Sequence, residues 1–355
     1  MGPSRALAVT WRQVIAWLAA VVLVLVALIV VLRSDGLPAT DAAASRATRW
    51  FVHQPSGRAV LVDGFGGRAL ASLPGGVAGE DLIVAESGNQ VFLLNDTSGN
   101  LRAIDTAELR LGPENGVSAL GSGRAVAQLG PSGLVVADTI DGDATFLPTG
   151  TDPVPFDFTG DVITSPGTDP DEGLAVAPDG TIWTISEGDL HRNTTAGTIV
   201  RELDFGDAVV SLVGNRPFLV DRTNRRAMLG EGQWVDIPAD IDGSEFVIQR
   251  PGPRYECGWV AAGDDLWCID ENEIVETSSI EGLGASGGDQ LAIAGDAAAL
   301  VRRFPTSLTH FDWRTDSMIH RDPITVAPAA RLAVTSTVDV IWIDAVAGAT
   351  GRTVP

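Results

Sequence analysis

The fold is decided by residues 173–206, which read GLAVAPDG-TIWTISEG-DLHRNTTAG-TIVRELDFG. The stretch contains four short β-rich runs, and the gaps between them carry Pro-Asp-Gly, Glu-Gly and Ala-Gly. Glycine and aspartate in such gaps supply the backbone freedom that tight hairpins need. The stretch therefore predicts a meander of four antiparallel strands.

A phrase of one aromatic, two apolar and one polar residue recurs along the chain about every 42 residues. Its copies with an aromatic residue at or near the start are found at Trp50, Phe92, Trp183, Phe218, Trp267 and Trp342. A period in this range, with four strands in each unit, is typical of a β-propeller. We therefore expect an all-β propeller over residues 48–355, in which these aromatic side chains fill the space between blades.

The two ends of the repeat region predict the number of blades. The first unit begins at its second strand, and residues 330–337, ARLAVTST, resemble the inner strand that this unit lacks. Pairing between the two would close the ring and remove two exposed strand edges. We therefore predict seven blades. Six or eight are the alternatives, because residues 338–351 start a further second strand.

Residues 14–32, VIAWLAAVVLVLVALIVVL, carry no charge. A helix of this length is about 30 Å long and spans the core of a bilayer. Arg5 and Arg12 precede it, which favours a cytoplasmic N-terminus. A cleaved signal peptide is the alternative, although its apolar region is usually shorter. We expect a cytoplasmic stub over 1–13, a transmembrane signal anchor over 14–32, a flexible stalk over 33–47 and a propeller outside the cell membrane.

The chain is strongly acidic, with a formal net charge of −22, and every one of its 24 Lys or Arg residues is arginine. Such a charge keeps a domain soluble and repels nucleic acid and anionic lipid surfaces. It is compatible with a basic partner or with a plain solvated surface. We therefore expect no nucleic-acid partner.

The two cysteines, Cys257 and Cys268, lie in the sequence YECGWVAAGDDLWCID. A hairpin turn centred on Ala262 and Gly263 would place them directly opposite each other, close enough for a disulfide. A location outside the cytoplasm would supply the oxidising environment. Two buried free thiols are the alternative, since two cysteines alone are too few ligands for a structural metal site. We predict the disulfide.

Two glycine-rich segments match enzyme motifs only in part. Residues 64–69, GFGGRA, follow a strand as a dinucleotide fingerprint would, but too few residues precede the next Pro-Gly-Gly to form its helix. Residues 284–288, GASGG, fit the pattern of a nucleophile elbow, but the residues after them predict a strand where the elbow needs a helix. We interpret both as turns.

The acidic and histidine residues show no metal-ligand spacing. The acidic stretches at 138–143 and 240–245 lack the ligand positions of an EF-hand loop. The four histidines are far apart in the sequence; they are His53, His191, His310 and His320. We therefore predict no catalytic, cofactor-binding or metal-binding residue.

Parts of the chain resemble known propeller repeats. Residues 50–76, WFVHQPSGRAVLVDGFGGRALASLPGG, resemble the YVTN-type repeat, and residues 170–186, PDEGLAVAPDGTIWTIS, resemble the repeat of NHL, gluconolactonase and streptogramin-lyase propellers. These resemblances imply the fold. The enzymes among those families use a metal in the central channel or a His–Glu pair, and neither set maps residue by residue onto this sequence.

The whole layout resembles a group of actinobacterial envelope proteins with one membrane anchor, an external propeller and fibronectin type III or immunoglobulin-like repeats. Residues 48–73 carry this resemblance, which implies an adhesive or scaffolding role. We therefore expect a membrane-anchored propeller that binds a protein or cell-wall partner. The alternative is a metal-dependent lactonase- or lyase-like enzyme that uses channel acids such as Asp171, Glu172 or Asp179.

Overall fold

Regular structure in this protein is almost entirely β-strand. The computed structural model describes residues 48–63, 68–117, 125–138, 143–148, 154–157, 173–186, 188–239, 245–252, 256–294, 297–302, 306–323, 331–336, 341–346 and 351–354. Within these ranges the helical residues are the 3-10 turn η1 (Gln54–Ser56) and Glu245. The strands belong to one compact unit, Arg46–Pro355.

The described strands form eight antiparallel sheets, numbered here in chain order. Sheet 1 contains β1 (Thr48–His53), β2 (Arg58–Asp63) and β3 (Ala69–Pro74). Sheet 2 contains β4 (Leu82–Ser87), β5 (Gln90–Asn95), β6 (Asn100–Asp105), β7 (Arg110–Leu111) and β8 (Asn115–Gly116). Sheet 3 contains β9 (Ala125–Gly130), β10 (Gly133–Asp138), β11 (Asp143–Pro148) and β12 (Val154–Asp157). Sheet 4 contains β13 (Leu174–Val176), β14 (Ile182–Ser186), β15 (Asp189–Thr194) and β16 (Gly197–Glu202).

The second half of the chain repeats this plan. Sheet 5 contains β17 (Ala208–Val213), β18 (Arg216–Asp221), β19 (Arg226–Leu229) and β20 (Val235–Asp236). Sheet 6 contains β21 (Val247–Ile248), β22 (Gly258–Ala262), β23 (Asp265–Ile269) and β24 (Ile274–Ser279). Sheet 7 contains β25 (Gln290–Ala294), β26 (Ala297–Arg302), β27 (Ser307–Asp312) and β28 (Ser317–Pro323). Sheet 8 contains β29 (Arg331–Ser336), β30 (Ile341–Val346) and β31 (Gly351–Val354).

Sheet 4 is the meander that residues 173–206 predict. Its strands pair in the order β13-β14-β15-β16, and all three pairs are antiparallel. Gly180 lies in the first turn and Gly197 follows the third, with φ of +93° and +122°. Side chains with a Cβ rarely adopt such angles, so glycine is required where the chain reverses. The predicted four-strand unit is confirmed.

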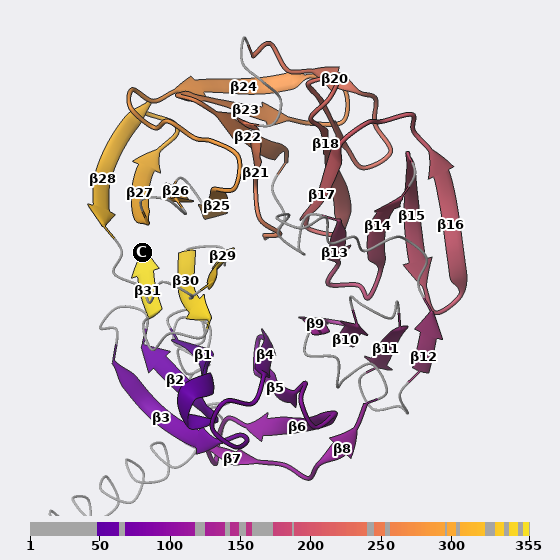
Figure 1. Ribbon diagram of the computed structural model, residues 1–355, viewed down its shortest axis with the longest axis vertical. Helices are drawn as coiled ribbons and strands as arrows, with labels where there is room; N and C mark the ends of the chain where they lie inside the picture. The colour runs from indigo at the N-terminus through magenta and orange to yellow at the C-terminus, as the bar shows by residue number, and fades with distance from the viewer. Residues whose placement is uncertain are drawn as a thin grey trace, which may run out of the picture. The chain divides into compact units, whose positions relative to one another are not determined.

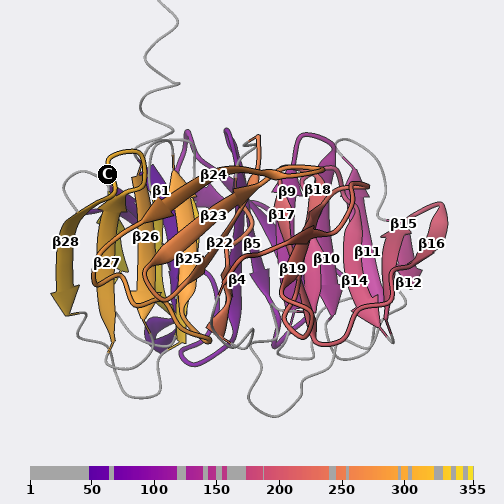
Figure 2. The ribbon, with the colours of Figure 1, turned by 90° about the horizontal axis from the view of Figure 1, so that it is seen from above.

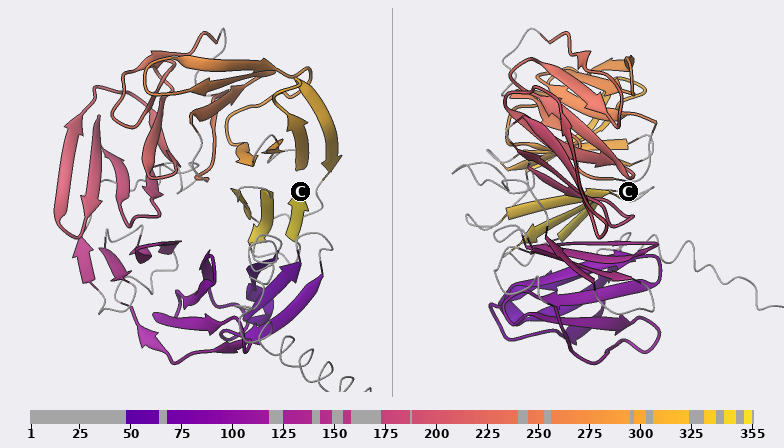
Figure 3. Two further views of the ribbon diagram at one scale, coloured as in Figure 1. Left: turned by 180° about the vertical axis from the view of Figure 1, so that it is seen from behind. Right: turned by 90° about the vertical axis from the view of Figure 1, so that its right-hand side faces the viewer.

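The sheets follow one another around a central axis (Figures 1 and 3). Near the axis β4 contacts β9, β9 contacts β13, β13 contacts β17, β21 contacts β25, and β25 contacts β29. Sheets 5 and 6 are joined by a hydrogen bond of 2.5 Å from the Ser211 hydroxyl to the Gln249 carbonyl oxygen. β1 lies beside both β4 and β30, which closes the ring. Seen from the side, the strands of most sheets run along this axis (Figure 2). The architecture is a β-propeller.

The core lies in layers between neighbouring sheets. Trp50 of sheet 1 packs with Leu93 of sheet 2, and Phe218 of sheet 5 packs with Val260 of sheet 6. Strands covered on both faces need apolar residues on both faces, and β10 is accordingly buried at every position. The outermost strands are different, since most residues of β16 are exposed. The propeller therefore keeps its apolar layers between the sheets, while its outermost strands are exposed and include Ile199 and Val200 on β16.

Sheet 1 begins at the second strand of the repeat, as predicted. Gly57 between β1 and β2 and Gly99 between β5 and β6 both have positive φ, at +63° and +72°. Each carbonyl accepts a hydrogen bond from the connection to the next sheet, from Gly75 N–H at 2.8 Å and from Val117 N–H at 3.1 Å. β1 therefore corresponds to β5, the second strand of sheet 2.

The predicted closure of the ring is wrong. β29, which covers most of residues 330–337, pairs with β30 and does not pair with β1. β30 and β31 follow β29, so the described residues form eight sheets, which was an alternative to the expected seven blades. The physical reason is chain proximity. Only four residues separate β29 from β30 in the sequence, so the entropic cost of bringing these two strands together is small.

The expected stub, anchor and stalk at residues 1–13, 14–32 and 33–47 lie outside the described residues. In the part of the chain that the structure does describe, no helix has both the length and the apolar character needed to cross a bilayer.

Candidate functional site

The polar residue that ends the recurrent phrase begins a tight turn. After β5, the Asn95 side-chain oxygen accepts a hydrogen bond of 3.1 Å from Ser98 N–H, and Gly99 follows in the left-handed region. After β18, the Asp221 carboxylate accepts a hydrogen bond of 3.1 Å from Asn224 N–H in the same way. Both polar side chains are buried. They therefore shape the turns at the end of the ring where one sheet is connected to the next.

A cavity of about 440 Å³ opens at this end, between sheets 1 and 2. Its walls are the connection from β3 to β4, strand β5 with its turn, and strand β6 with the chain that follows β7. The polar lining residues are Glu80, Asn95, Ser98, Asn100, Arg102 and Glu114. A space of this size lies in the range of small-ligand pockets and would hold a single large side chain.

The wall from β3 to β4 is packed tightly against neighbouring side chains at Gly75 and Gly76. A Cβ atom on Gly75 would lie 2.5 Å from the Leu93 side chain, and a Cβ atom on Gly76 would overlap the Glu80 carboxylate. The two glycine N–H groups donate hydrogen bonds of 2.8 and 3.0 Å to the Gly57 carbonyl oxygen. This wall is therefore fixed to the turn between β1 and β2.

Glu80 brings a negative charge to the cavity. Its Oε2 accepts hydrogen bonds of 2.6 Å from Val77 N–H and 2.8 Å from the Asn95 side-chain amide. Both donors are uncharged, and Glu80 forms no ion pair with any of the described residues. The side chain is half-buried. Its charge is therefore held in place without being neutralised.

The outer wall lies where the fourth strand of sheet 2 is interrupted. β7 and β8 both pair with β6, and residues 112–114 separate them. Arg102 on β6 bridges the interruption: its Nε donates a hydrogen bond of 3.0 Å to the Gly112 carbonyl oxygen, and its Nη1 lies 3.3 Å from Glu114 Oε1. This ion pair neutralises Arg102 within the wall, so the lining as a whole keeps one net negative charge.

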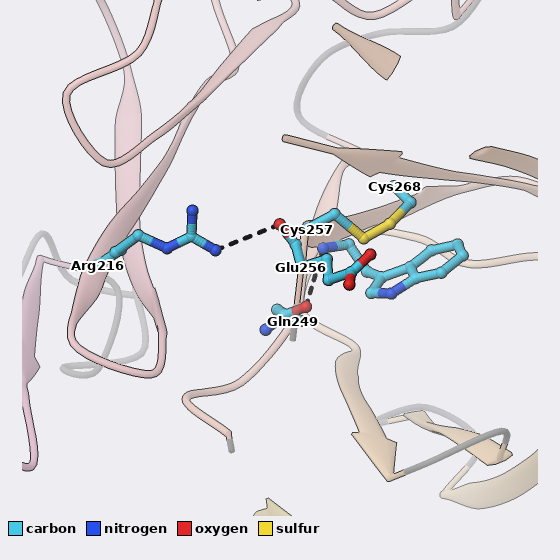
Figure 4. Close-up of a disulfide and its surroundings, with 6 residues drawn as sticks. Arg216, Gln249, Glu256, Cys257 and Cys268 are labelled. Carbon is cyan, nitrogen blue, oxygen red and sulfur yellow. Dashed lines mark hydrogen bonds between the residues drawn. A yellow bond between two sulfur atoms is a disulfide. The ribbon is translucent and has the colours of Figure 1, made fainter. Parts of the chain in front are cut away.

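Cys257 and Cys268 form the predicted disulfide, with their Cα atoms 5.5 Å apart (Figure 4). The register differs from the prediction, because Trp259 is the residue opposite Cys268. The turn is centred one residue later than expected, so the two cysteines are diagonal neighbours. A shift of two positions keeps both side chains on the same face of the sheet, which explains why the bond still forms.

The disulfide lies beside the junction of sheets 5 and 6. Arg216 of sheet 5 donates a hydrogen bond of 3.2 Å to the carbonyl oxygen of Glu256, next to Cys257 (Figure 4). Gln249 accepts a hydrogen bond of 2.9 Å from Trp259 N–H through its side chain. The Cys257–Cys268 disulfide therefore fixes the start of β22, the segment that Arg216 and Gln249 both contact.

The predicted blade aromatics differ in burial and position. Trp50, Phe218 and Trp267 are buried, and Phe92 and Trp183 are half-buried against apolar clusters. Those on the second strand of the repeat are Trp50, Phe92, Trp183, Phe218 and Trp342. Trp267 lies on the third strand, β23; Trp259, which sequence reasoning missed, takes the second-strand position and is 2% exposed.

The acids proposed for a channel metal are not brought together by the described residues. Asp171 and Glu172 lie outside them, and Asp179 is a turn residue whose Oδ1 accepts a hydrogen bond of 2.9 Å from Thr181 N–H. Residues 284–288 form a loop before β25, as interpreted from the sequence. Within the described ranges, no group of three or more His, Cys, Asp or Glu side chains is placed to hold a metal ion.

The structure brings two of the four histidines together. His310 and His320 are directly opposite each other on β27 and β28. The pKa of His310 is lowered, mainly by burial of the ring and to a smaller extent by the charge of the neighbouring His320. His53 lies elsewhere, with its Nδ1 2.5 Å from the Ser56 hydroxyl, and His191 is buried in β15. The pair on sheet 7 was not visible as a ligand spacing in the sequence, because it depends on strand register.

No protein-family model matches the chain, and no curated protein matches it. Among solved structures, it is similar to a catalytically inactive virginiamycin B lyase from Staphylococcus aureus with quinupristin, with a TM-score of 0.54, 14% identity, and coverage of 87% of this chain and 98% of that chain. A streptogramin B lyase gives a TM-score of 0.54 at 10% identity, covering 86% of this chain and 96% of that chain. KlHsv2 with a replaced loop gives 0.51 at 9% identity, covering 74% and 87%. At these identities the likeness shows the fold alone.

Proposed function

We propose that this protein is a membrane-anchored propeller that lies outside the cytoplasm and binds a protein or cell-envelope partner. The observation that carries the proposal is the Cys257–Cys268 disulfide. Disulfides persist in oxidising compartments and are rare in the cytosol. The uncharged segment 14–32 supplies an apolar length suited to hold such a domain at a membrane.

Binding is proposed to occur at the end of the ring where the sheets are connected. A rigid ring with loops at its ends is a scaffold of the kind on which binding residues usually lie. The cavity between sheets 1 and 2 lies at this end, and Val77 at its edge is 69% exposed. This exposed valine gives a point from which a partner can be captured.

Localisation is tested on intact cells that produce the full-length chain. A protease that does not cross membranes should remove the propeller without lysis, and alkylation before reduction should leave both cysteines unlabelled. Digestion only after lysis, or labelled thiols, would contradict the proposal. A stoichiometric metal ion in the purified protein would favour the metal-dependent enzyme instead.

The partner is tested by placing a photo-crosslinking amino acid at Val77 in the full-length protein. The matched control carries the same amino acid at Val275 on β24, which is 48% exposed. A defined adduct is expected from position 77 and not from position 275 when intact cells are irradiated. The same adducts from both positions, or none from either, would count against binding at this end of the ring.

A further inference from the structure

We infer that the cavity between sheets 1 and 2 receives a cationic side chain, arginine or lysine, of the partner polypeptide. The inference rests on the proposed binding function and adds the chemistry of the group that is recognised.

The first step is the unbalanced charge of Glu80. Both of its hydrogen bonds, from Val77 N–H and from the Asn95 amide, end on Oε2. Its Oε1 has no hydrogen-bond partner among the described residues. A half-buried carboxylate without a cation nearby is costly to desolvate, and an incoming ammonium or guanidinium group would relieve that cost.

The second step is that Arg102, the cation in the cavity wall, is already engaged. Its Nε and Nη1 are bound to the Gly112 carbonyl oxygen and to Glu114 Oε1, at 3.0 and 3.3 Å. The ion pair with Glu114 fixes the guanidinium at the interrupted outer strand, and it forms no ion pair with Glu80. Among the described residues no cation is bound to Glu80, so a partner that supplies a cation would neutralise it.

The third step is the match between the rest of the cavity and a long basic side chain. Pro74 and Val77 offer apolar contact for an aliphatic stem, while the side chains of Ser98 and Asn100 offer oxygen acceptors for its charged end. The formal net charge of −22 also attracts a basic partner at long range. Charge, size and the mixture of apolar and polar walls all point to the same ligand group.

The test measures fluorescence anisotropy of labelled pentapeptides with the purified full-length protein in detergent. One peptide carries a single central arginine, and its partner carries citrulline, which has nearly the same shape and no charge. The arginine peptide should bind about tenfold more tightly than the citrulline peptide, as a charge-assisted contact to a half-buried carboxylate predicts. Equal binding of the two peptides would overturn the inference.

Two variants that change the net charge equally distinguish binding in the cavity from attraction by the overall negative charge of the protein. Glu80→Gln keeps an acceptor for Val77 N–H and should remove most of the preference for arginine over citrulline. Glu108→Gln is the matched control, because Glu108 lies beyond the other end of β6 in an exposed ion pair of 2.6 Å with Arg110. It should keep the preference. An equal loss in both variants, with thermal unfolding unchanged, would overturn the inference.

Two further outcomes are informative. Displacement of the arginine peptide by one equivalent of calcium chloride would identify an inorganic cation site and overturn the inference. If the protein crosslinks to a partner through position 77 but binds the arginine and citrulline peptides equally well, the proposed function stands. Only the inference about the ligand is then overturned.

Discussion

The Glu86 carboxylate on β4 accepts a hydrogen bond of 3.0 Å from the Trp50 N–H on β1. The contact joins sheets 1 and 2 at the edge of β1 that faces away from β2. No described strand pairs with β1 at that edge. Burial raises the pKa of Glu86 above 4.5, and this effect outweighs the opposing effects of the Trp50 N–H and of the Arg49 charge. The junction of the first two sheets therefore contains a carboxyl group whose neutral form is favoured by folding.

The stability of the protein should consequently depend on the protonation of Glu86. Because its pKa is higher in the folded state than in the unfolded state, its contribution to the free energy of unfolding is fully present below pH 4.5 and decreases as the pH rises through the folded pKa. Glu86→Gln keeps an acceptor for Trp50 N–H and removes the titration. The variant should be more stable than the wild type at neutral pH, with a difference that shrinks towards pH 4.5. Urea unfolding of both proteins across this pH range, followed by tryptophan fluorescence, measures it. A difference that does not change with pH would contradict the prediction.

Asp221 and Asp105 begin similar turns and differ in exposure. The Asp221 side chain is 0% exposed and lies 3.0 Å from Arg226 Nε, whereas the Asp105 side chain is 37% exposed. Asp221→Ala removes the ion pair with Arg226 and the acceptor for Asn224 N–H, and should lower the free energy of unfolding by about 3 kcal/mol. Asp105→Ala should have a much smaller effect, because solvent replaces its lost contacts. Chemical denaturation of the two variants compares them, and similar losses would refute the role of burial.

Gly258 lies at the junction of sheets 5 and 6, against the ring of Phe218. A Cβ atom at this position would be 2.6 Å from the Phe218 ring, which is 0% exposed. Gly258→Ala should therefore destabilise the protein by about 1–3 kcal/mol through overpacking. Gly116→Ala is the control, since nothing lies within 4 Å of its added Cβ atom. Thermal unfolding should separate the two, and an unchanged midpoint for Gly258→Ala would show that the sheets can move apart freely.

The disulfide should stabilise sheet 6 mainly by restricting the unfolded chain. The two cysteines are 11 residues apart in the sequence, and a loop of this size corresponds to about 3 kcal/mol. Replacing both Cys257 and Cys268 by alanine should lower the unfolding midpoint by the same amount as reduction of the wild type with dithiothreitol. The double variant itself should not respond to the reductant; a response would show that reduction acts elsewhere.

The four-strand units were predictable because their signal is local. Residues 173–206 carry their own turn residues, and the hydrogen-bonded neighbours of each strand are the next strands in sequence. The disulfide pair was predictable for the same reason. Its register was not, because the run from Ala262 to Asp265 can place a tight turn at more than one position, and packing selects among them.

The closure of the ring and the cavity could not be predicted from local patterns. β29 had two possible partners, and the choice depends on their separation in sequence and on the contact of β29 with β25 of sheet 7. The cavity depends on Gly76, Glu80, Asn95 and Arg102, which come from separate segments that each look like an ordinary turn or strand end. They meet because two sheets pack together, and no single segment contains that information.

The pairing of β29 with β30 has a consequence for how the chain acquires its structure. Every described sheet is built from one continuous stretch of sequence, so none has to wait for a distant strand before its hydrogen bonds can form. Contacts between near neighbours in sequence form quickly, which favours stepwise, vectorial folding. A polypeptide of this design can mature one meander at a time as it emerges from a ribosome or a translocation channel, and the docking of β1 against β30 is then the final event of assembly.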